Sequence, residues 1–140
     1  QEQTREQKMM LLSRFIRSEG GLLLGVQGGS FDQGIDYPNN SLKGVIIAGI
    51  SLARPDLETK SLIERYDREY GKGMEYGYIY PAVQKAIQAS GRAIRTEKDK
   101  AAIIYLDERF TWSNYRPVFM DQNFVISREP WEKVKGFGWD

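Results

Sequence analysis

Hydrophobic residues recur at helical spacing in three stretches of the chain, which predicts three amphipathic helices. These stretches are residues 3–18, 56–70 and 81–95. Gly20-Gly21 follows the first stretch and Gly71-Lys72-Gly73 follows the second, as expected where a helix stops. Asp56 stands where a cap or a first-turn acid is expected. Pro81 suits the first position of the third helix because its missing N–H costs nothing there.

Three short runs are apolar at almost every position, which is typical of strands buried on both faces of a sheet. They are residues 22–26, 44–50 and 101–106, and a tyrosine-rich connector is expected at 74–80. Strands that alternate with helices predict an α/β fold whose parallel sheet has right-handed crossovers. Three strands lie at the low end for a parallel sheet. Because the chain also opens on Gln1, we expect a piece of a longer protein.

The regular pattern weakens after residue 110. Aromatic residues there are scattered among polar ones, and Pro117 and Pro130 interrupt any long element. We therefore predict a domain over residues 1–110, followed by an aromatic C-terminal tail over 111–140. The sequence leaves open whether this tail packs on the domain or on another one.

Composition excludes several classes of site. The 140 residues contain neither cysteine nor histidine, so disulfide scaffolds, cysteine-ligated clusters, Cys or His nucleophiles and the usual zinc sites are excluded within the chain. We predict no metal site. The formal charge of +1 indicates no global attraction to nucleic acid, so any such surface must be local. No run reaches the ~20 apolar residues of a membrane span.

A glycine-rich loop at residues 27–37 follows the first predicted strand, and ligands of parallel sheets bind beyond the carboxyl ends of strands. Its glycines would let a ligand approach the backbone, and Asp36 could accept a hydrogen bond from a sugar hydroxyl. The alternative is a tight strand exit. The chain has no phosphate-loop or dinucleotide-binding glycine pattern, so it cannot hold a nucleotide's phosphates unaided in either of these ways.

The helix predicted at 81–95 carries a second candidate site. Gln88, Arg92 and Arg95 are spaced by four and three residues, so they gather on one side of its last turns. Together they could present three planar donors to one anion, and arginine stabilises the charge of a transferring phosphoryl group. The alternative is a helix whose terminal arginines complement its dipole. No catalytic base or metal-binding pair of carboxylates stands out nearby.

Three segments together resemble the XPD/DinG-type helicases of superfamily two. The segment from Gly28 to Pro38, Gly-Gly-Ser-Phe-Asp-Gln-Gly-Ile-Asp-Tyr-Pro, resembles motif V of that family. The segment from Gln88 to Arg95, Gln-Ala-Ser-Gly-Arg-Ala-Ile-Arg, resembles motif VI. The strand from Ala101 and the Asp-Glu-Arg-Phe that ends at Phe110 resemble the strand and the Asp-x-Arg-Phe sequence that come after motif VI in the family. Order and spacing also agree, over roughly residues 20–110.

The resemblance implies the C-terminal part of the second of two RecA-like motor domains, with an α/β parallel sheet flanked by helices. It implies an ATP-dependent 5′–3′ DNA helicase with roles in DNA repair, working in the cytoplasm, or in the nucleus of a eukaryote. ATP with Mg would be shared with the first motor domain, and an iron–sulfur cluster is expected only outside this chain. The implied partners are single-stranded DNA, the first motor domain and repair-complex subunits. The fragment alone is expected to be inactive.

The resemblance also assigns roles to residues. Arg95 would be the arginine finger towards the γ-phosphate, with Arg92 as a second catalytic arginine. Gln88 would lie beside them, and Gly34 and Asp36 would lie at the nucleotide edge of motif V. The loop departs from the family pattern at Ser30 (usually Lys), Asp32 (usually Ser) and Gln33 (usually Glu). The missing lysine removes the basis for a direct phosphate contact from this loop.

Single-strand grooves combine basic groups with aromatic side chains. Arg54 and Lys60, with the tyrosines between 66 and 80, are the candidates for DNA contacts. The alternative places Tyr66 and Tyr70 in the core and the charges on a solvated helix face, and for the two tyrosines we expect this alternative. Asp107 and Arg109 are expected to form a structural ion pair.

Two other functions fit the same sequence. One is a non-catalytic protein-interaction module derived from a helicase domain, with the aromatic tail as its contact. The other is a complete small nucleotide-binding protein, which would bind ATP by itself.

Overall fold

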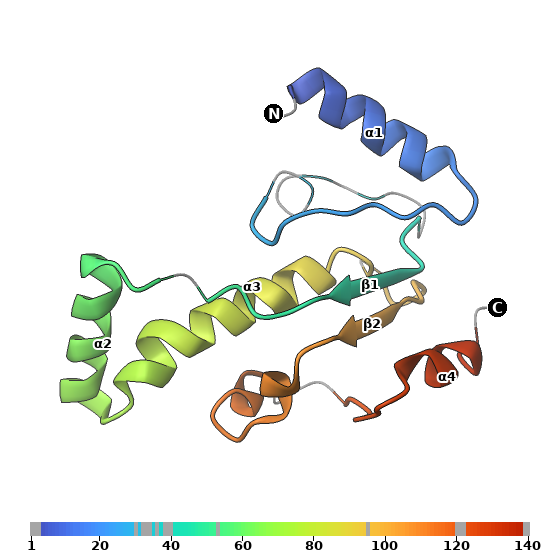
Figure 1. The fold of residues 1–140 in the computed structure, drawn as a ribbon. Helices are drawn as coiled ribbons and strands as arrows, with labels where there is room; N and C mark the ends of the chain where they lie inside the picture. The colour runs from blue at the N-terminus through green and yellow to red at the C-terminus, as the bar shows by residue number, and fades with distance from the viewer. Residues whose placement is uncertain are drawn as a thin grey trace.

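The structure is a computed structural model that describes residues 4–29, 31, 35, 37, 41–52, 54–94, 96–119 and 123–138. Its elements follow one another in the order α1 (Arg5–Arg17), β1 (Gly44–Ile47), α2 (Leu57–Tyr70), a π-helix (Glu75–Ile79), α3 (Tyr80–Ser90), β2 (Ala102–Tyr105), two 3₁₀ turns (Glu108–Thr111 and Arg116–Phe119) and α4 (Pro130–Lys135). In Figure 1, α3 runs alongside the two strands, and α2 lies beyond the ends to which the strands point.

The two strands pair in parallel, with Gly44 opposite Ala102 and Ile47 opposite Tyr105. This confirms the predicted α/β fold with a parallel sheet, although β1 ends at Ile47 and not at residue 50. The predicted burial on both faces is wrong. Ile47 is buried against α3, whereas its neighbour Ile46 is 56% exposed, because successive residues of a strand point to opposite faces.

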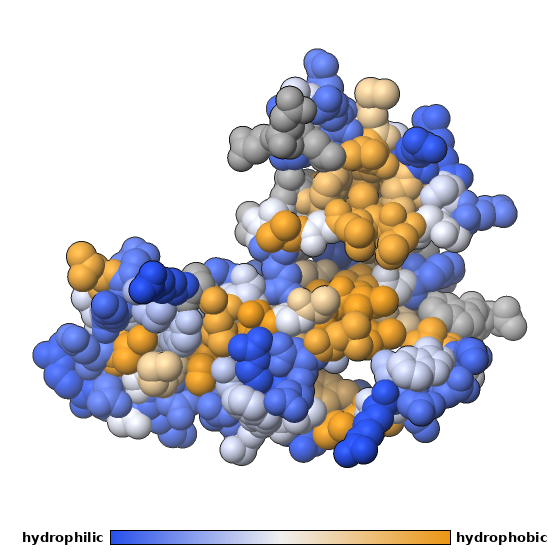
Figure 2. Space-filling view, viewed as in Figure 1, coloured by the Kyte–Doolittle hydropathy of each residue, from blue (hydrophilic) through white to orange (hydrophobic). Residues whose placement is uncertain are grey.

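The strand predicted at residues 22–26 is also wrong, because this segment has no regular secondary structure. Leu22, Leu24 and Val26 are each 79% exposed. A strand needs a neighbour for its backbone hydrogen bonds, and the only strand pair of the described residues joins β1 to β2. Figure 2 shows the result, a hydrophobic area that extends from α1 towards the sheet.

Helix α1 confirms the first predicted helix. It begins with a capping box in which the Thr4 hydroxyl accepts from the Gln7 backbone and the Gln7 side chain accepts from Thr4 N. Of its apolar side only Leu12 is buried, and Met10 is 73% exposed.

Helix α2 confirms the second predicted helix and its cap. The Asp56 carboxylate accepts a hydrogen bond from Thr59 N at 2.8 Å, which lowers the pKa of Asp56. At the other end Gly71 has a φ of 63°, a left-handed conformation that favours glycine. The cap and the glycine together fix both ends of α2.

The tyrosine-rich connector predicted at residues 74–80 is helical, since a π-helix at Glu75–Ile79 leads directly into α3. Gly77 explains how α2 packs against it. A Cβ at Gly77 would lie 2.8 Å from the backbone nitrogen of Ile63, so only glycine allows this approach. Gly73 N donates to the Asp67 carboxylate at 3.3 Å, which closes the turn between the helices.

The core lies between α3, the end of β1 and the two 3₁₀ turns. Val83 and Ala86 of α3 are fully buried. They belong to one hydrophobic cluster with Ile47, Ile50, Ile79, Ala82, Phe110, Tyr115 and Phe119. Residues beyond 110 thus contribute to this core, while Val125 and Ile126 are exposed. The division of the chain at residue 110 stays a prediction. Among the described residues, no helix has the length and hydrophobicity of a membrane-spanning segment.

Candidate functional site

Helix α3 ends at Ser90, so the helix predicted to continue to residue 95 is too long. The Ser90 hydroxyl donates to the Ile87 carbonyl at 2.8 Å, and this carbonyl also accepts from Gly91 N at 2.9 Å. Side-chain bonds of this kind compete with the helical pattern. Arg92 therefore leaves from a turn, whereas Gln88 is exposed on the helix itself. Their spacing predicts that Gln88 and Arg92 are neighbours on one continuous helix. This prediction is wrong, because the helix ends between them.

Arg92 is half-buried, and its Nε is buried without a hydrogen-bond partner among the described atoms. A buried donor that lacks a partner costs free energy, which an incoming acceptor would recover. Of the other predicted nucleotide-site residues, Gly34, Asp36 and Arg95 lie outside the described residues, as do the departures at Ser30, Asp32 and Gln33. Their positions relative to Arg92 stay predictions.

Gly91 separates Ser90 from Arg92 and has an ordinary helical φ of −64°. Its backbone conformation therefore does not require glycine. A Cβ there would lie 3.4 Å from the Ile87 carbonyl oxygen and 3.6 Å from that of Gln88, which are ordinary van der Waals distances. The described geometry of this turn therefore does not by itself require glycine at this position.

Gln27, the first residue of the glycine-rich loop, is a polar residue that the sequence patterns do not single out. Its Nε2 donates to the Gly49 carbonyl at 3.2 Å, which ties the start of the glycine-rich loop to the segment that follows β1. Its Oε1 is buried without a partner among the described atoms. The sequence shows only that Gln27 lies between an apolar run and Gly28-Gly29. A glutamine in that position does not predict a particular hydrogen bond or role.

Asp107 and Arg109 form the expected ion pair at the end of β2. The carboxylate accepts from Arg109 Nε at 2.9 Å and from the terminal guanidinium nitrogen at 2.7 Å. It also accepts from Arg109 N at 3.0 Å. The side-chain bond to Arg109 lowers the pKa of Asp107, and the same bond raises the pKa of Arg109. Both charges are therefore satisfied by each other and by the backbone.

This ion pair gives a pH-dependent prediction. Because the pKa of Asp107 is lowered from its ordinary value of 3.8 in the folded state, its contribution to stability is complete above that value and is lost as the pH falls through the folded pKa. Asp107→Asn should therefore lower the free energy of unfolding at neutral pH, and the difference from wild type should shrink below about pH 4.

Urea unfolding at several pH values measures this difference. Glu108→Gln is the control because it removes the neighbouring, exposed carboxylate. A difference for Asp107→Asn that stays constant down to about pH 2 would contradict the assignment.

The DNA candidates do not form a single face. Of the two predicted basic contacts, Lys60 is exposed on α2, and Arg54 precedes that helix. Lys60 precedes Tyr66 by six residues, which places it about 120° away around α2. Cation and aromatic ring therefore point in different directions.

The tyrosines form a cluster of their own, made of Tyr66, Tyr70, Tyr76 and Tyr80. Their ring centroids are separated by 5.4–6.2 Å. The expectation that Tyr70 faces the core is wrong, because it is 60% exposed, whereas Tyr66 is half-buried. The π-helix brings Tyr76 against the two tyrosines of α2 and adds a packing partner that the sequence does not indicate.

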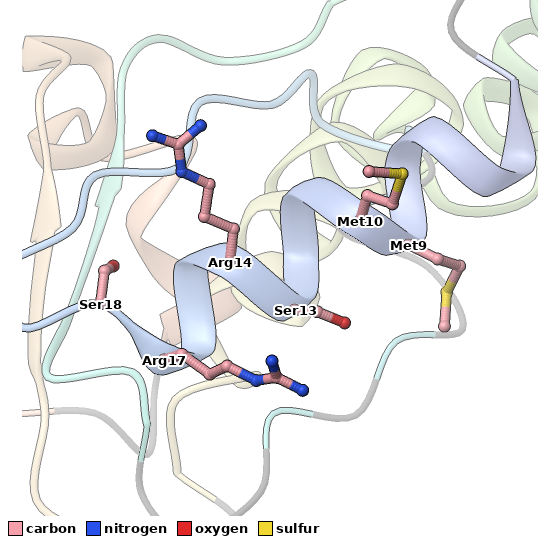
Figure 3. A pocket seen from close by; sticks show the side chains of 6 residues that line it. All are labelled: Met9, Met10, Ser13, Arg14, Arg17 and Ser18. Carbon is pink, nitrogen blue, oxygen red and sulfur yellow. The ribbon is translucent and has the colours of Figure 1, made fainter.

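A shallow hollow of about 630 Å³ lies along α1 and is lined by Met9, Met10, Ser13, Arg14, Arg17 and Ser18. Figure 3 shows that the labelled side chains point in different directions around the helix and do not converge. We assign it no ligand. No cluster of acidic side chains able to hold a metal ion occurs in the described part of the chain.

The chain matches the helicase C-terminal domain family over residues 1–123. A homologue of regulator of telomere elongation helicase 1 from Oryza sativa subsp. japonica is 32% identical over 106 residues, which are 69% of this chain and 10% of that protein. The protein named 3′-5′ exonuclease DinG from Staphylococcus saprophyticus is 29% identical over 135 residues, or 96% of this chain and 14% of that protein. The protein named 3′-5′ exonuclease DinG from Staphylococcus aureus strain COL is 27% identical over 136 residues, which are 97% of this chain and 14% of that protein.

The chain therefore belongs to the helicase C-terminal domain family. Its relatives identify it as the C-terminal region of an XPD/DinG-type helicase of superfamily two, with part of a RecA-like domain. It spans only 10–14% of the length of these relatives.

Proposed function

We propose that this chain is the arginine-bearing half of the ATP site in an ATP-dependent DNA helicase. The observation that carries the proposal is the position of Arg92. It leaves the turn after α3 with a buried Nε that no described atom accepts from, within the segment that resembles motif VI. An acceptor supplied from outside the chain, such as a phosphate oxygen, would satisfy it.

The chemistry depends on charge. Phosphoryl transfer is catalysed by positioning and by electrostatic stabilisation of the transferred group. In the proposal, Arg95 reaches the γ-phosphate and Arg92 supports it, while Gln88, Gly34 and Asp36 border the nucleotide. The phosphate loop and the Mg ligands belong to the first motor domain. Closure of the two domains would bring the arginines onto ATP, and reopening would shift the grip on DNA.

The finer features of the proposal rest on the family resemblance. They are movement in the 5′–3′ direction, a role in DNA repair with repair-complex subunits as partners, and an iron–sulfur cluster held elsewhere in the protein. The isolated chain is proposed to lack activity, because it contains no phosphate-loop pattern.

The test uses the full-length protein and compares ATP turnover with and without single-stranded DNA. A DNA-dependent rise in turnover, together with separation of a duplex that carries a 5′ tail, would support the proposal. ATP turnover that DNA leaves unchanged would contradict it.

Single-stranded DNA is proposed to contact Arg54 and Lys60. Each phosphate contact contributes about 0.7 to the slope of log affinity against log salt for single strands. Arg54→Ala combined with Lys60→Ala should therefore weaken binding and lower this slope by about 1.4. Fluorescence anisotropy of labelled oligonucleotides at several salt concentrations measures both quantities.

Lys98→Ala is the matched control for this prediction. Lys98 precedes β2 and Arg54 follows β1, so in a parallel sheet they lie at opposite ends of the strands. If Lys98→Ala changes the slope as much as the double variant does, Arg54 and Lys60 are not specific DNA contacts.

A protein-interaction module is the second candidate. The observation in its favour is the exposed aromatic and aliphatic residues of the tail, with Trp131 54% exposed and Val125 74% exposed. A full-length protein that binds a partner through this tail and neither binds nor hydrolyses ATP would favour it.

A further inference from the structure

Ser90 is a buried polar residue directly before the turn that carries Arg92. It is 1% exposed, and its hydroxyl lies 2.8 Å from the Tyr105 hydroxyl of β2. The same Ser90 hydroxyl donates to the Ile87 carbonyl at 2.8 Å. One atom thus connects the last turn of α3 to the adjacent strand.

The direction of these bonds is fixed by proton counting. A hydroxyl has one proton, and the Ile87 carbonyl can only accept. Ser90 therefore donates to Ile87, and Tyr105 must donate to Ser90. Tyr105, which is partly buried against the core, is consequently held as a neutral donor, in keeping with the burial that raises its pKa.

The turn loses backbone support beyond Gly91. Gly91 N donates to the Ile87 carbonyl at 2.9 Å, but the next two backbone hydrogen bonds are long, 3.4 Å from Arg92 N to the Ala89 carbonyl and 3.3 Å from Ala93 N to the Ser90 carbonyl. The strong anchors are the Ser90 contacts on one side of Arg92 and the buried Ala93 on the other. The Ser90 contacts are therefore one of the anchors that fix the backbone from which the Arg92 side chain starts.

Tyr105 can fix Ser90 because its own ring is held. Ring centroids of Phe110, Phe119 and Phe124 lie 4.8, 5.3 and 6.5 Å from that of Tyr105. An aromatic cluster that includes residues beyond 110 is thereby connected to the arginine turn through one hydroxyl.

We propose that Tyr105 is a positioning residue, which holds the Arg92 turn in place for ATP hydrolysis through its hydrogen bond to Ser90. The proposal rests on the proposed function, in which Arg92 acts at the ATP site. It assigns Tyr105 no contact with the nucleotide.

The test measures ATP turnover by the full-length protein with saturating single-stranded DNA. Tyr105→Phe removes one oxygen and keeps the ring. Since a misplacement of about 1 Å in a catalytic site can lower the rate about 10²-fold, we expect kcat to fall by about tenfold, with KM for ATP changed less than about twofold.

Tyr115→Phe is the control. Tyr115 is 5% exposed in the same core, and its hydroxyl takes no part in the Ser90 contact. Its kcat should stay close to that of wild type.

Two further measurements separate positioning from a general loss of stability. Ser90→Ala should lower kcat as Tyr105→Phe does, and the double variant should be no slower than the slower single variant, because both remove the same bond. The melting temperature of each variant is recorded beside its kcat. Equal kcat values for Tyr105→Phe and Tyr115→Phe, or additive losses in the double variant, would overturn the positioning role.

Arg92→Ala distinguishes failure of this proposal from failure of the proposed function. If Arg92→Ala is impaired while Tyr105→Phe matches wild type, only the positioning role is wrong. If the wild-type protein does not hydrolyse ATP, or Arg92→Ala is fully active, both proposals are overturned.

Discussion

Replacing Arg95 with alanine in the full-length protein is expected to lower DNA-stimulated ATP turnover by about 10³-fold or more. An arginine finger neutralises the charge that spreads over the transferred phosphoryl group, and such residues are worth about 10³–10⁵ in kcat. Arg92→Ala should also lower kcat, since in the proposed function Arg92 supports Arg95 at the ATP site, and its Nε has no acceptor among the described atoms. Steady-state turnover at saturating ATP and DNA measures both losses.

Lysine should not restore the activity. Arg95→Lys keeps the charge but loses the planar fork of donors that matches phosphate oxygens. Arg68→Ala is the matched control, because Arg68 is an exposed arginine of α2 outside the motif VI segment. Turnover of Arg95→Ala close to that of wild type would show that Arg95 is not the finger. An equal loss in Arg68→Ala would show that the effect is not specific to the motif.

Phe119→Ala is expected to cause the largest loss of stability that we predict. Phe119 is 3% exposed, and its ring centroid lies 5.1–5.7 Å from those of Tyr105, Phe110 and Phe124. Truncation of a buried phenylalanine removes its transfer free energy and leaves a cavity, at a cost of about 3–5 kcal/mol. Denaturant unfolding of the variant and of wild type under the same conditions measures this difference.

Trp131→Ala is the control for aromatic truncation as such. Trp131 is 54% exposed, so its removal should change the free energy of unfolding by about 0.5 kcal/mol or less. If the two variants are equally stable, Phe119 does not belong to the core of the folded protein.

Periodicity predicts the elements that carry their own local signals. Helix α2 has an apolar side, a capping aspartate and a terminal glycine, so Asp56 and Gly71 mark its ends. The parallel pairing of β1 with β2 is predictable in the same way, because a helical crossover between two apolar runs leaves few alternatives.

The sequence does not predict the structure correctly where it depends on distant parts of the chain or on unusual helical geometry. Residues 22–26 have the composition of a buried strand, but a strand exists only beside another one, and composition does not supply the neighbour. The π-helix at Glu75–Ile79 interrupts the 3.6-residue repeat, so its tyrosines match no helical pattern.

Within the candidate site, the sequence identifies Arg92 but not its surroundings. Motif spacing places Gln88, Arg92 and Arg95 on one helix, whereas α3 ends at Ser90, before Arg92. The hydrogen bond from Tyr105 joins residues that are 15 positions apart. No local pattern indicates such a contact, because it depends on how α3 packs on the sheet.

The unpaired segment at residues 22–26 has a consequence for the behaviour of this chain in solution. Three aliphatic side chains, each 79% exposed, lie on a segment that has no strand partner among the described residues, and unpaired apolar segments are templates for association between identical molecules. The 140 residues by themselves are therefore expected to aggregate as their concentration rises. Solubility, more than folding, would then limit the concentration at which the isolated 140 residues can be studied.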